Sequence, residues 1–269
     1  MRLTAAVFLV VSALVFIRPD PVEAWSSDDR AVAVFGNGGA SSNPHGYSVV
    51  VDSSGNIYTT GRFGSPSAGN EPVDFDPGPG TANLTSNGHY DAFVSKLNSS
   101  GDLVWAKSFG SSGSKTLYSN SVAVDSSGNV YTTGQLWGTA DFDPGPGTTN
   151  LTSVAGTDVF VSKLDSSGDL VWAANFGGEG MTTERGSSVT VDSSGNAYFT
   201  GEFNGPADFD PGVGTTTLTA TPNNGSDCPC NREVFVLKLG SSGDLVWAKS
   251  FGNYLGEQVE SVAVDSSGN

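Results

Sequence analysis

Short runs of apolar residues, each four to eight residues long and bounded by Gly, Ser, Asp or Asn, fill most of this chain. In the central part these runs lie at 121–125, from 130 onward, at 158–164 and at 170–176. Apolar and aromatic residues occur at odd and even positions alike, so both faces of each strand are expected to be packed. The pattern predicts four antiparallel strands, here called a, b, c and d.

Two turns of the same kind connect strand a to b and strand c to d. They read Ser-Ser-Gly-Asn at 126–129 and Asp-Ser-Ser-Gly-Asp at 165–169. An Asp or Asn side chain can accept hydrogen bonds from backbone N–H groups just ahead of it, and Gly tolerates the left-handed conformation of a tight hairpin. Asp52, Asp125, Asp192 and Asp265 are therefore expected to be turn residues.

The whole unit is repeated along the chain. The phrase V-D-S-S-G-N begins at Val51, Val124, Val191 and Val264, and F-V-S-K-L-D-S-S-G-D-L-V-W-A has its copies at 93–106, 160–173 and 235–248. A third phrase, D-F-D-P-G, lies at 74–78, 141–145 and 208–212, which gives a period near 67 residues. Length differences between copies fall on either side of the third phrase, so it is expected to lie in a surface loop.

Four antiparallel strands repeated in this way predict an all-β fold, a β-propeller of four-stranded blades. The first two phrases resemble the bacterial β-propeller repeat family of exported and cell-surface proteins, over nearly all of residues 32–269. That resemblance implies a propeller and no single activity. The blades are expected at about 47–110, 120–177 and 187–252, with a partial blade from 260.

The register of the repeats predicts an incomplete ring. Residues 31–36 align with the end of a strand d, and the last residues form a strand a with its turn. Three full blades do not close a ring, since closure takes about four to eight. We therefore expect a piece of a longer chain, with open sheet edges that allow self-association.

The N-terminus predicts export. Residues 1–24 have the features of a signal peptide: Arg2, an apolar run at 3–17 and Val-Glu-Ala before position 25. The remainder, 25–269, is the repeat region, expected to be secreted or at the cell surface and without membrane insertion after cleavage. The formal net charge of −16 disfavours nucleic acid as a partner.

Candidate chemistry is sparse in this sequence. The histidines His45 and His89 are expected in exposed loops, and no catalytic motif includes them. Cys228 and Cys230 lie too close for an unstrained bridge, which leaves free thiols, a strained bridge or an intermolecular bond open. Trp105, Trp172 and Trp247 are expected to pack in the core or between sheets, with stacking on a ligand as the alternative. The Asp pairs of the D-F-D-P-G phrase could hold Ca²⁺, or could serve only as turn residues; they are Asp74, Asp76, Asp141, Asp143, Asp208 and Asp210.

Strand alternation places all Ser-Ser-Gly turns at one face and all D-F-D-P-G loops at the other. Binding is expected on the face with the long loops, because loops carried by a rigid scaffold commonly hold function. The sequence thus favours a non-enzymatic binding module with a protein or carbohydrate partner. The alternative is an exported hydrolase or lyase that acts on polysaccharide, for which no catalytic residues can be named.

Overall fold

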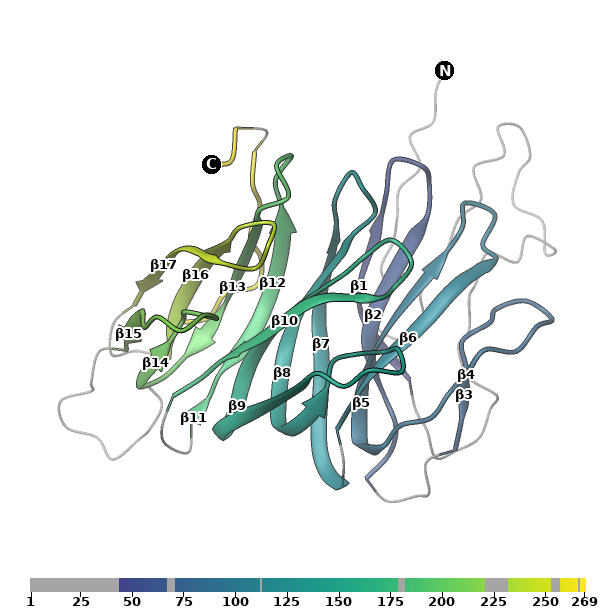
Figure 1. Cartoon of the computed structure of the whole chain (residues 1–269), viewed down its shortest axis with the longest axis horizontal. Coiled ribbons are helices and arrows are strands. Elements are labelled where there is room, and N and C mark those ends of the chain that lie inside the picture. The colour runs from purple at the N-terminus through teal and green to yellow at the C-terminus, as the bar shows by residue number, and fades with distance from the viewer. Residues whose placement is uncertain are drawn as a thin grey trace.

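The computed structural model describes residues 44–66, 71–111, 113–178, 182–220, 232–252, 257–265 and 267–269. Within these ranges every regular element is a β-strand, as the sequence predicted. The strands form three four-stranded antiparallel blades that lie next to one another (Figure 1). The signal-peptide segment, the strand expected at 31–36, and Cys228 and Cys230 lie outside the described residues.

Each blade consists of two hairpins joined by a longer connection. Blade 1 contains β1 (His45–Val51), β2 (Ile57–Phe63), β5 (Gly88–Leu97) and β6 (Leu103–Ser111). Blade 2 contains β7 (Gly113–Val124), β8 (Val130–Asp141), β9 (Asn150–Leu164) and β10 (Leu170–Phe176). Blade 3 contains β12 (Arg185–Val191), β13 (Ala197–Phe203), β16 (Glu233–Leu239) and β17 (Leu245–Phe251). A short β11 (Thr182–Thr183) pairs with β9.

The D-F-D-P-G segment of each copy lies at the end of a small two-stranded ribbon. These ribbons are β3 (Val73–Asp74) with β4 (Asn83–Leu84) in the first copy, and β14 (Pro206–Asp208) with β15 (Thr217–Thr219) in the third. In the second copy the ribbon is continuous with β8 and β9, where Asp141 pairs with Asn150. Strand c of this copy, predicted at 158–164, is therefore much longer than predicted.

The hairpin turns follow the predicted chemistry. Asp125 Oδ1 accepts hydrogen bonds from the N–H groups of Ser127 and Asn129, both at 2.9 Å. Its Oδ2 accepts from the Asn129 side chain at 2.7 Å, and Gly128 adopts a φ of 81°. Asp52, Asp192 and Asp265 accept the same backbone hydrogen bonds in the other copies. The prediction that these aspartates are turn residues is confirmed.

The core lies within and between the blades, and part of it comes from the D-F-D-P-G phrase. The prediction of a simple surface loop was wrong for its Phe residues, since Phe75, Phe142 and Phe209 are fully buried. Phe142 packs against Phe160 of its own blade at 5.0 Å between ring centroids. It also stacks on Phe109 of blade 1 at 5.4 Å. In the second and third copies the phrase therefore joins a blade to the one before it, since Phe209 stacks on Phe176 in the same way.

Backbone pairing reinforces this contact between blades. Gly110 at the end of β6 pairs with Asp141 of β8, and Gly177 forms the equivalent bridge to Asp208. The first strands also adjoin, because Val122 N–H donates to Ser48 Oγ and Val189 N–H donates to Ser121 Oγ. Val262 N–H donates to Ser188 Oγ in the same way, although 257–265 form no hydrogen-bonded strand.

The predicted packing role of the tryptophans is confirmed for Trp105 and Trp172. Trp105 Nε1 donates to the carbonyl of Ser166 in the next blade at 3.1 Å, and Trp172 Nε1 donates to that of Ser241 at 3.3 Å. Both rings pack against core clusters. Within the described ranges we find no helix of the length and apolarity that a membrane span requires.

Candidate functional site

The two faces of the blades differ in the way the sequence predicted. In Figure 1 the turns that join β1 to β2, β7 to β8 and β12 to β13 are at the top, and the β3–β4 and β14–β15 ribbons lie toward the bottom. We call these the turn face and the loop face. The turn face holds one candidate site, and the loop face holds two.

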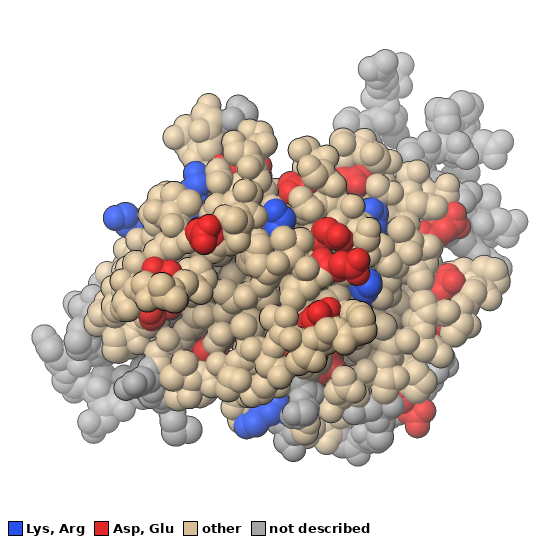
Figure 2. All heavy atoms as spheres, in the orientation of Figure 1, with Lys and Arg blue, Asp and Glu red and all other residues tan. Residues whose placement is uncertain are grey.

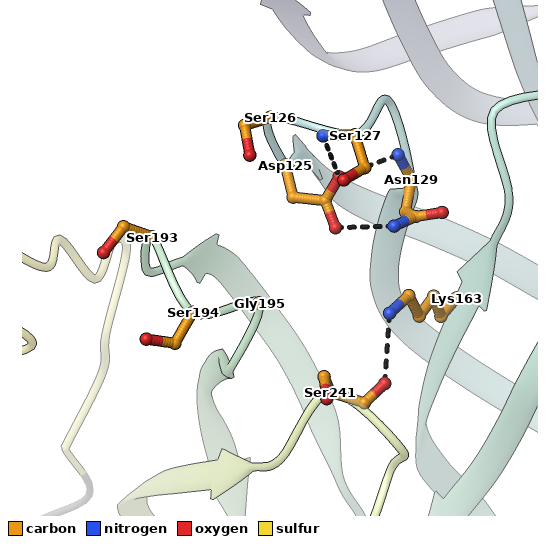
Figure 3. Close-up of a pocket in the computed structure, with 9 residues that line it drawn as sticks. All are labelled: Asp125, Ser126, Ser127, Asn129, Lys163, Ser193, Ser194, Gly195 and Ser241. Atoms are coloured by element: carbon orange, nitrogen blue, oxygen red, sulfur yellow. Dashed lines mark hydrogen bonds between the residues drawn. The ribbon is translucent and has the colours of Figure 1, made fainter.

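The turn face has a small polar hollow of about 210 Å³ between blades 2 and 3 (Figure 3). It is lined by the β7–β8 turn, the β12–β13 turn, Lys163 of β9 and Ser241 of the β16–β17 turn. The charged groups in it already have partners. Lys163 Nζ donates to the Ser241 carbonyl at 3.0 Å and lies 5.0 Å from the centroid of the Tyr131 ring.

The same arrangement occurs between blades 1 and 2, which indicates a structural role for the hollow. There Lys96 Nζ lies 3.4 Å from the Ser166 carbonyl and 5.2 Å from the centroid of the Tyr58 ring. Burial, followed by the hydrogen bond to the neighbouring Asp52, raises the pKa of the Tyr58 hydroxyl well above its usual range. The groups that line the hollow thus hold neighbouring blades together.

The carboxylates of the D-F-D-P-G phrase take up backbone hydrogen bonds at the loop face. Asp141 Oδ1 accepts from the N–H groups of Asp143 and Thr149 at 3.0 and 2.8 Å, and Asp143 Oδ1 accepts from Gly145 N–H at 2.8 Å. Hydrogen bonds of this kind, from Ala82 and Asp76, lower the pKa of Asp74. Each of these carboxylates thus accepts the backbone hydrogen bonds that are expected of a turn residue.

The residues predicted for calcium are Asp74, Asp76, Asp141, Asp143, Asp208 and Asp210. Within the described residues no group of three or more Asp, Glu, His or Cys side chains lies in an arrangement that could hold a metal ion. A calcium ion would have to use one Asp pair completed by backbone carbonyl groups. Calcium binding stays a prediction, and the backbone hydrogen bonds give each carboxylate a function without it.

A β-bulge in the first strand of each blade presents one residue outside the regular pairing. The register shifts between Gly46 and Ser48 in β1, between Ser119 and Ser121 in β7 and between Gly186 and Ser188 in β12. The extra residues are Tyr47, Asn120 and Ser187. Bulges re-aim a side chain and are common next to functional sites. The three repeats therefore present three different side chains from one fixed backbone feature.

Glycine on the neighbouring strand makes the bulge possible. Gly134 of β8 pairs with Ser119, and a Cβ atom at Gly134 would collide with the carbonyl oxygen of Tyr118. Gly61 and Gly201 are confined in the same manner by His45 and Arg185. The glycine at this position of each copy thus allows the close approach of the two strands.

Blades 1 and 2 carry an unusual group of side chains beside these bulges. The guanidinium carbon of Arg62 lies 4.3 Å from the centroid of the Tyr90 ring and 4.8 Å from that of the Tyr118 ring. The two rings are themselves 5.8 Å apart. Arg62 Nε is buried without a hydrogen-bond partner, and the ion pairs among the described residues do not include Arg62.

The group continues across blade 2 through strand pairing. Tyr90 of β5 is in register with Thr116 of β7, and Thr116 is in register with Trp137 of β8. Lys115 Nζ lies 4.4 Å from the centroid of the Trp137 ring, which is 42% exposed. We call this set the aromatic–cation cluster; its members are Tyr47, Arg62, Tyr90, Lys115, Tyr118 and Trp137.

The electrostatics of the aromatic–cation cluster differ from those of the rest of the chain. Only 12 Lys and Arg residues oppose 28 Asp and Glu residues, and Figure 2 shows acidic side chains scattered over the visible face with few cations. Burial, followed by the charge of Arg62, lowers the pKa of His45. Burial raises the pKa of Tyr47, and Arg62 acts on it in the opposite direction. The cluster thus places positive charge among aromatic rings, and the ion pairs between described residues include neither Arg62 nor Lys115.

Sequence reasoning did not find this cluster, although a signal was present. Each member is specific to one copy: Arg62 corresponds to Gln135 and Glu202, and Trp137 corresponds to Gly64 and Asn204. A comparison of the three copies for unshared residues would have selected these positions. The cross-strand register that brings them together is not visible in the sequence.

The expectation of exposed loop histidines was wrong in part. His45 is exposed but begins β1, and His89 is partly buried within β5. Buried carboxylates on the same side of the blades serve structural contacts: Asp158 accepts from the Asn175 side chain at 2.7 Å, and Glu202 pairs with Arg232 at 3.0 Å. These contacts do not bring a histidine and a carboxylate together in an acid–base arrangement.

Two comparisons with known proteins bear on the fold. Residues 104–142 match the family model described as Beta-propeller repeat (SBBP). The chain is also 27% identical, over 164 residues, to the uncharacterized WD repeat-containing protein L264 of Acanthamoeba polyphaga mimivirus. That alignment covers 58% of this chain and 11% of the viral protein, so the chain spans about a tenth of its length. Together with the three blades, these matches support a β-propeller repeat protein, a scaffold typical of interaction modules.

Proposed function

We propose that this protein is an exported, non-enzymatic binding module whose loop face contacts an extracellular partner. One observation carries the proposal: each residue of the aromatic–cation cluster occurs in one copy of the repeat and is replaced by a different residue at the equivalent positions of the other copies. Tyr, Trp and Arg are the residues enriched at the energetic centres of binding interfaces. The turn face, in contrast, repeats the same Ser, Asp, Lys and Trp contacts between blades.

Export is part of this proposal and rests on the features of residues 1–24. It is tested by producing the chain in a secretion-competent host and measuring the mass of the exported protein. We expect removal of the first 24 residues, which leaves Trp25 as the new N-terminus. Retention of the full chain inside the cell would contradict export and would leave the assignment of the binding face to the next experiment.

The binding face is tested with an array of extracellular polysaccharides and proteins probed with the labelled protein. We expect that Trp137→Ala lowers the signal and that Ser127→Arg, which obstructs the turn-face hollow, leaves it unchanged. Lys249 is exposed on β17, so Lys249→Ala serves as the control for loss of one positive charge. Loss of binding in Ser127→Arg with retention in Trp137→Ala would assign binding to the turn face and would contradict the proposal.

The alternative, a polysaccharide hydrolase or lyase, is tested on the same array. A polysaccharide that binds is incubated with the protein, and new reducing ends and unsaturated sugar products are measured. A binding module leaves the chain length of the polysaccharide unchanged. Turnover by the wild-type protein would overturn the non-enzymatic proposal.

A further inference from the structure

We infer that the aromatic–cation cluster binds a sugar acid, a pyranose ring that carries a carboxylate, within an acidic polysaccharide. This inference rests on the proposed function and names the ligand class of the same face. Its basis is a correspondence between three chemical features of the cluster and three features of such a ring.

The first feature is positive charge held in place for an anion. The guanidinium of Arg62 is fixed by the two tyrosine rings at 4.3 and 4.8 Å, so little side-chain entropy remains to be lost on binding. A planar guanidinium matches the planar geometry of a carboxylate. Lys115 supplies a second cation, which lies 4.4 Å from the centroid of the Trp137 ring. In a chain with a net charge of −16, these two cations make the cluster a local site that favours a negatively charged ligand.

The second feature is flat apolar surface open to solvent. Trp137 and Tyr47 are each 42% exposed, and both are carried by strands that hold their backbones rigidly. A pyranose ring has a face of C–H groups that can lie on an aromatic ring. Aromatic side chains bury large apolar area with few rotatable bonds, which makes them suitable platforms.

The third feature is the presence of neutral hydrogen-bonding residues at strand positions next to the aromatic residues. Thr116 lies in register between Tyr90 and Trp137, and Gln135 pairs with Tyr118 on the adjacent strand. Both side chains are partly exposed. They offer the hydroxyl and amide groups that a sugar's hydroxyl groups would require.

Strand pairing argues against an extended acidic peptide at this place. Peptides commonly bind to sheets by adding a strand to an unpaired edge. Here one edge of β7 pairs with β8, and near Tyr90 its other edge pairs with β5, so the backbone groups at this end of β7 are occupied. A ligand at this end is therefore recognised by side chains, which suits a sugar ring better than a peptide backbone.

The experiment measures binding of tetragalacturonate, a chain of four sugar acids, by calorimetry. Maltotetraose serves as the neutral sugar of equal length, and tetraglutamate as the acidic peptide. We expect binding of tetragalacturonate alone. Arg62→Ala should weaken it by about tenfold or more, since a charge-assisted hydrogen bond contributes about 1.5–3 kcal/mol. Trp137→Ala should also weaken binding, whereas Lys249→Ala should not.

Folding is controlled within the same experiment. Arg62→Lys keeps the charge but loses the planar donor edge, so an intermediate affinity is expected; unfolding of any variant would appear as a changed circular dichroism spectrum. Equal binding of maltotetraose would overturn the charge argument, and equal binding of tetraglutamate would overturn the sugar. If tetragalacturonate fails while array binding is still lost in Trp137→Ala, the sugar acid is excluded and the proposed binding module stands.

Discussion

The contact between blades can be tested by truncating one repeated phenylalanine in two settings. Phe109 lies near the end of strand d of blade 1 and Phe251 ends strand d of blade 3, and the two residues occupy equivalent positions in the repeated sequence. Phe109 is fully buried under Phe142, whereas Phe251 is 58% exposed. Phe109→Ala and Phe251→Ala remove the same atoms, and their difference measures what the covering D-F-D-P-G ribbon contributes.

The expected magnitudes follow from burial. Truncation of a buried Phe to Ala removes transferred apolar area and leaves a cavity, which costs about 3–5 kcal/mol. At Phe251 less than half of the side chain is buried, so the loss is roughly 0.6–1.3 kcal/mol, from about 1.5–3 kcal/mol for full burial. In a protein of this size 1 kcal/mol changes the Tm by about 2–4 °C. Phe109→Ala should therefore lower the Tm by about 6–20 °C, and Phe251→Ala by about 1–5 °C.

The assay is thermal unfolding followed by circular dichroism near 218 nm and by tryptophan fluorescence. Trp105 and Trp172 donate hydrogen bonds across the boundaries between blades, so their fluorescence reports on the separation of neighbouring blades. In the Phe109→Ala variant the fluorescence transition should move at least as far as the circular dichroism transition. Equal changes in Tm for the two variants would refute the reasoning, because they would show that the ribbon adds no stability to the residue it covers.

Three further predictions concern carboxylates. Burial raises the pKa of Asp158 above its ordinary value of 3.8, so its contribution to stability is fully present below that value and is lost as the pH rises through the folded-state pKa. Asp158→Asn should therefore have a higher Tm than the wild type at pH 7, and the difference in Tm should shrink toward pH 4. A lower Tm of the variant at both pH values would contradict this. Asp125→Ala removes the acceptor of several turn hydrogen bonds and should cost about 1–3 kcal/mol in urea unfolding, with the exposed Ser126→Ala unchanged. If the Asp141 and Asp143 pair holds Ca²⁺, calorimetry should show heat and a raised Tm that the double Asn variant abolishes; no heat in either protein would leave only the turn role.

Local chemistry made much of the fold predictable from the sequence. The Asp-Ser-Ser-Gly turns need only a side-chain acceptor and a glycine within a few residues, and both are visible in the repeated phrases. The four strands of each blade follow from the apolar runs between these turns. The burial of Phe142 was missed because it depends on Phe109 of another blade, and no local pattern records that contact.

The candidate site was less predictable for the same reason. Tyr90 and Trp137 are far apart in the sequence. They lie close together because both are paired in register with Thr116 of β7. Sequence reasoning chose the loop face from the positions of its insertions, and the cluster lies in the strands beside that face rather than in the loops. Repetition directed attention to the shared phrases, whereas the informative residues are those that the copies do not share.

The bulge in each first strand has a consequence for how such a protein can change its specificity. Tyr47, Asn120 and Ser187 stand outside the regular pairing, while the glycine on the adjoining strand maintains the shape that holds them there. At the exposed Tyr47 a codon change can alter the chemistry presented to a ligand with little effect on the ladder, whereas Asn120 Nδ2 donates to the Gly186 carbonyl of the next blade at 2.8 Å. Duplication of the repeat then copies an unchanged frame together with one position outside the pairing. Recognition could diversify one residue at a time, in a chain whose architecture is inherited whole.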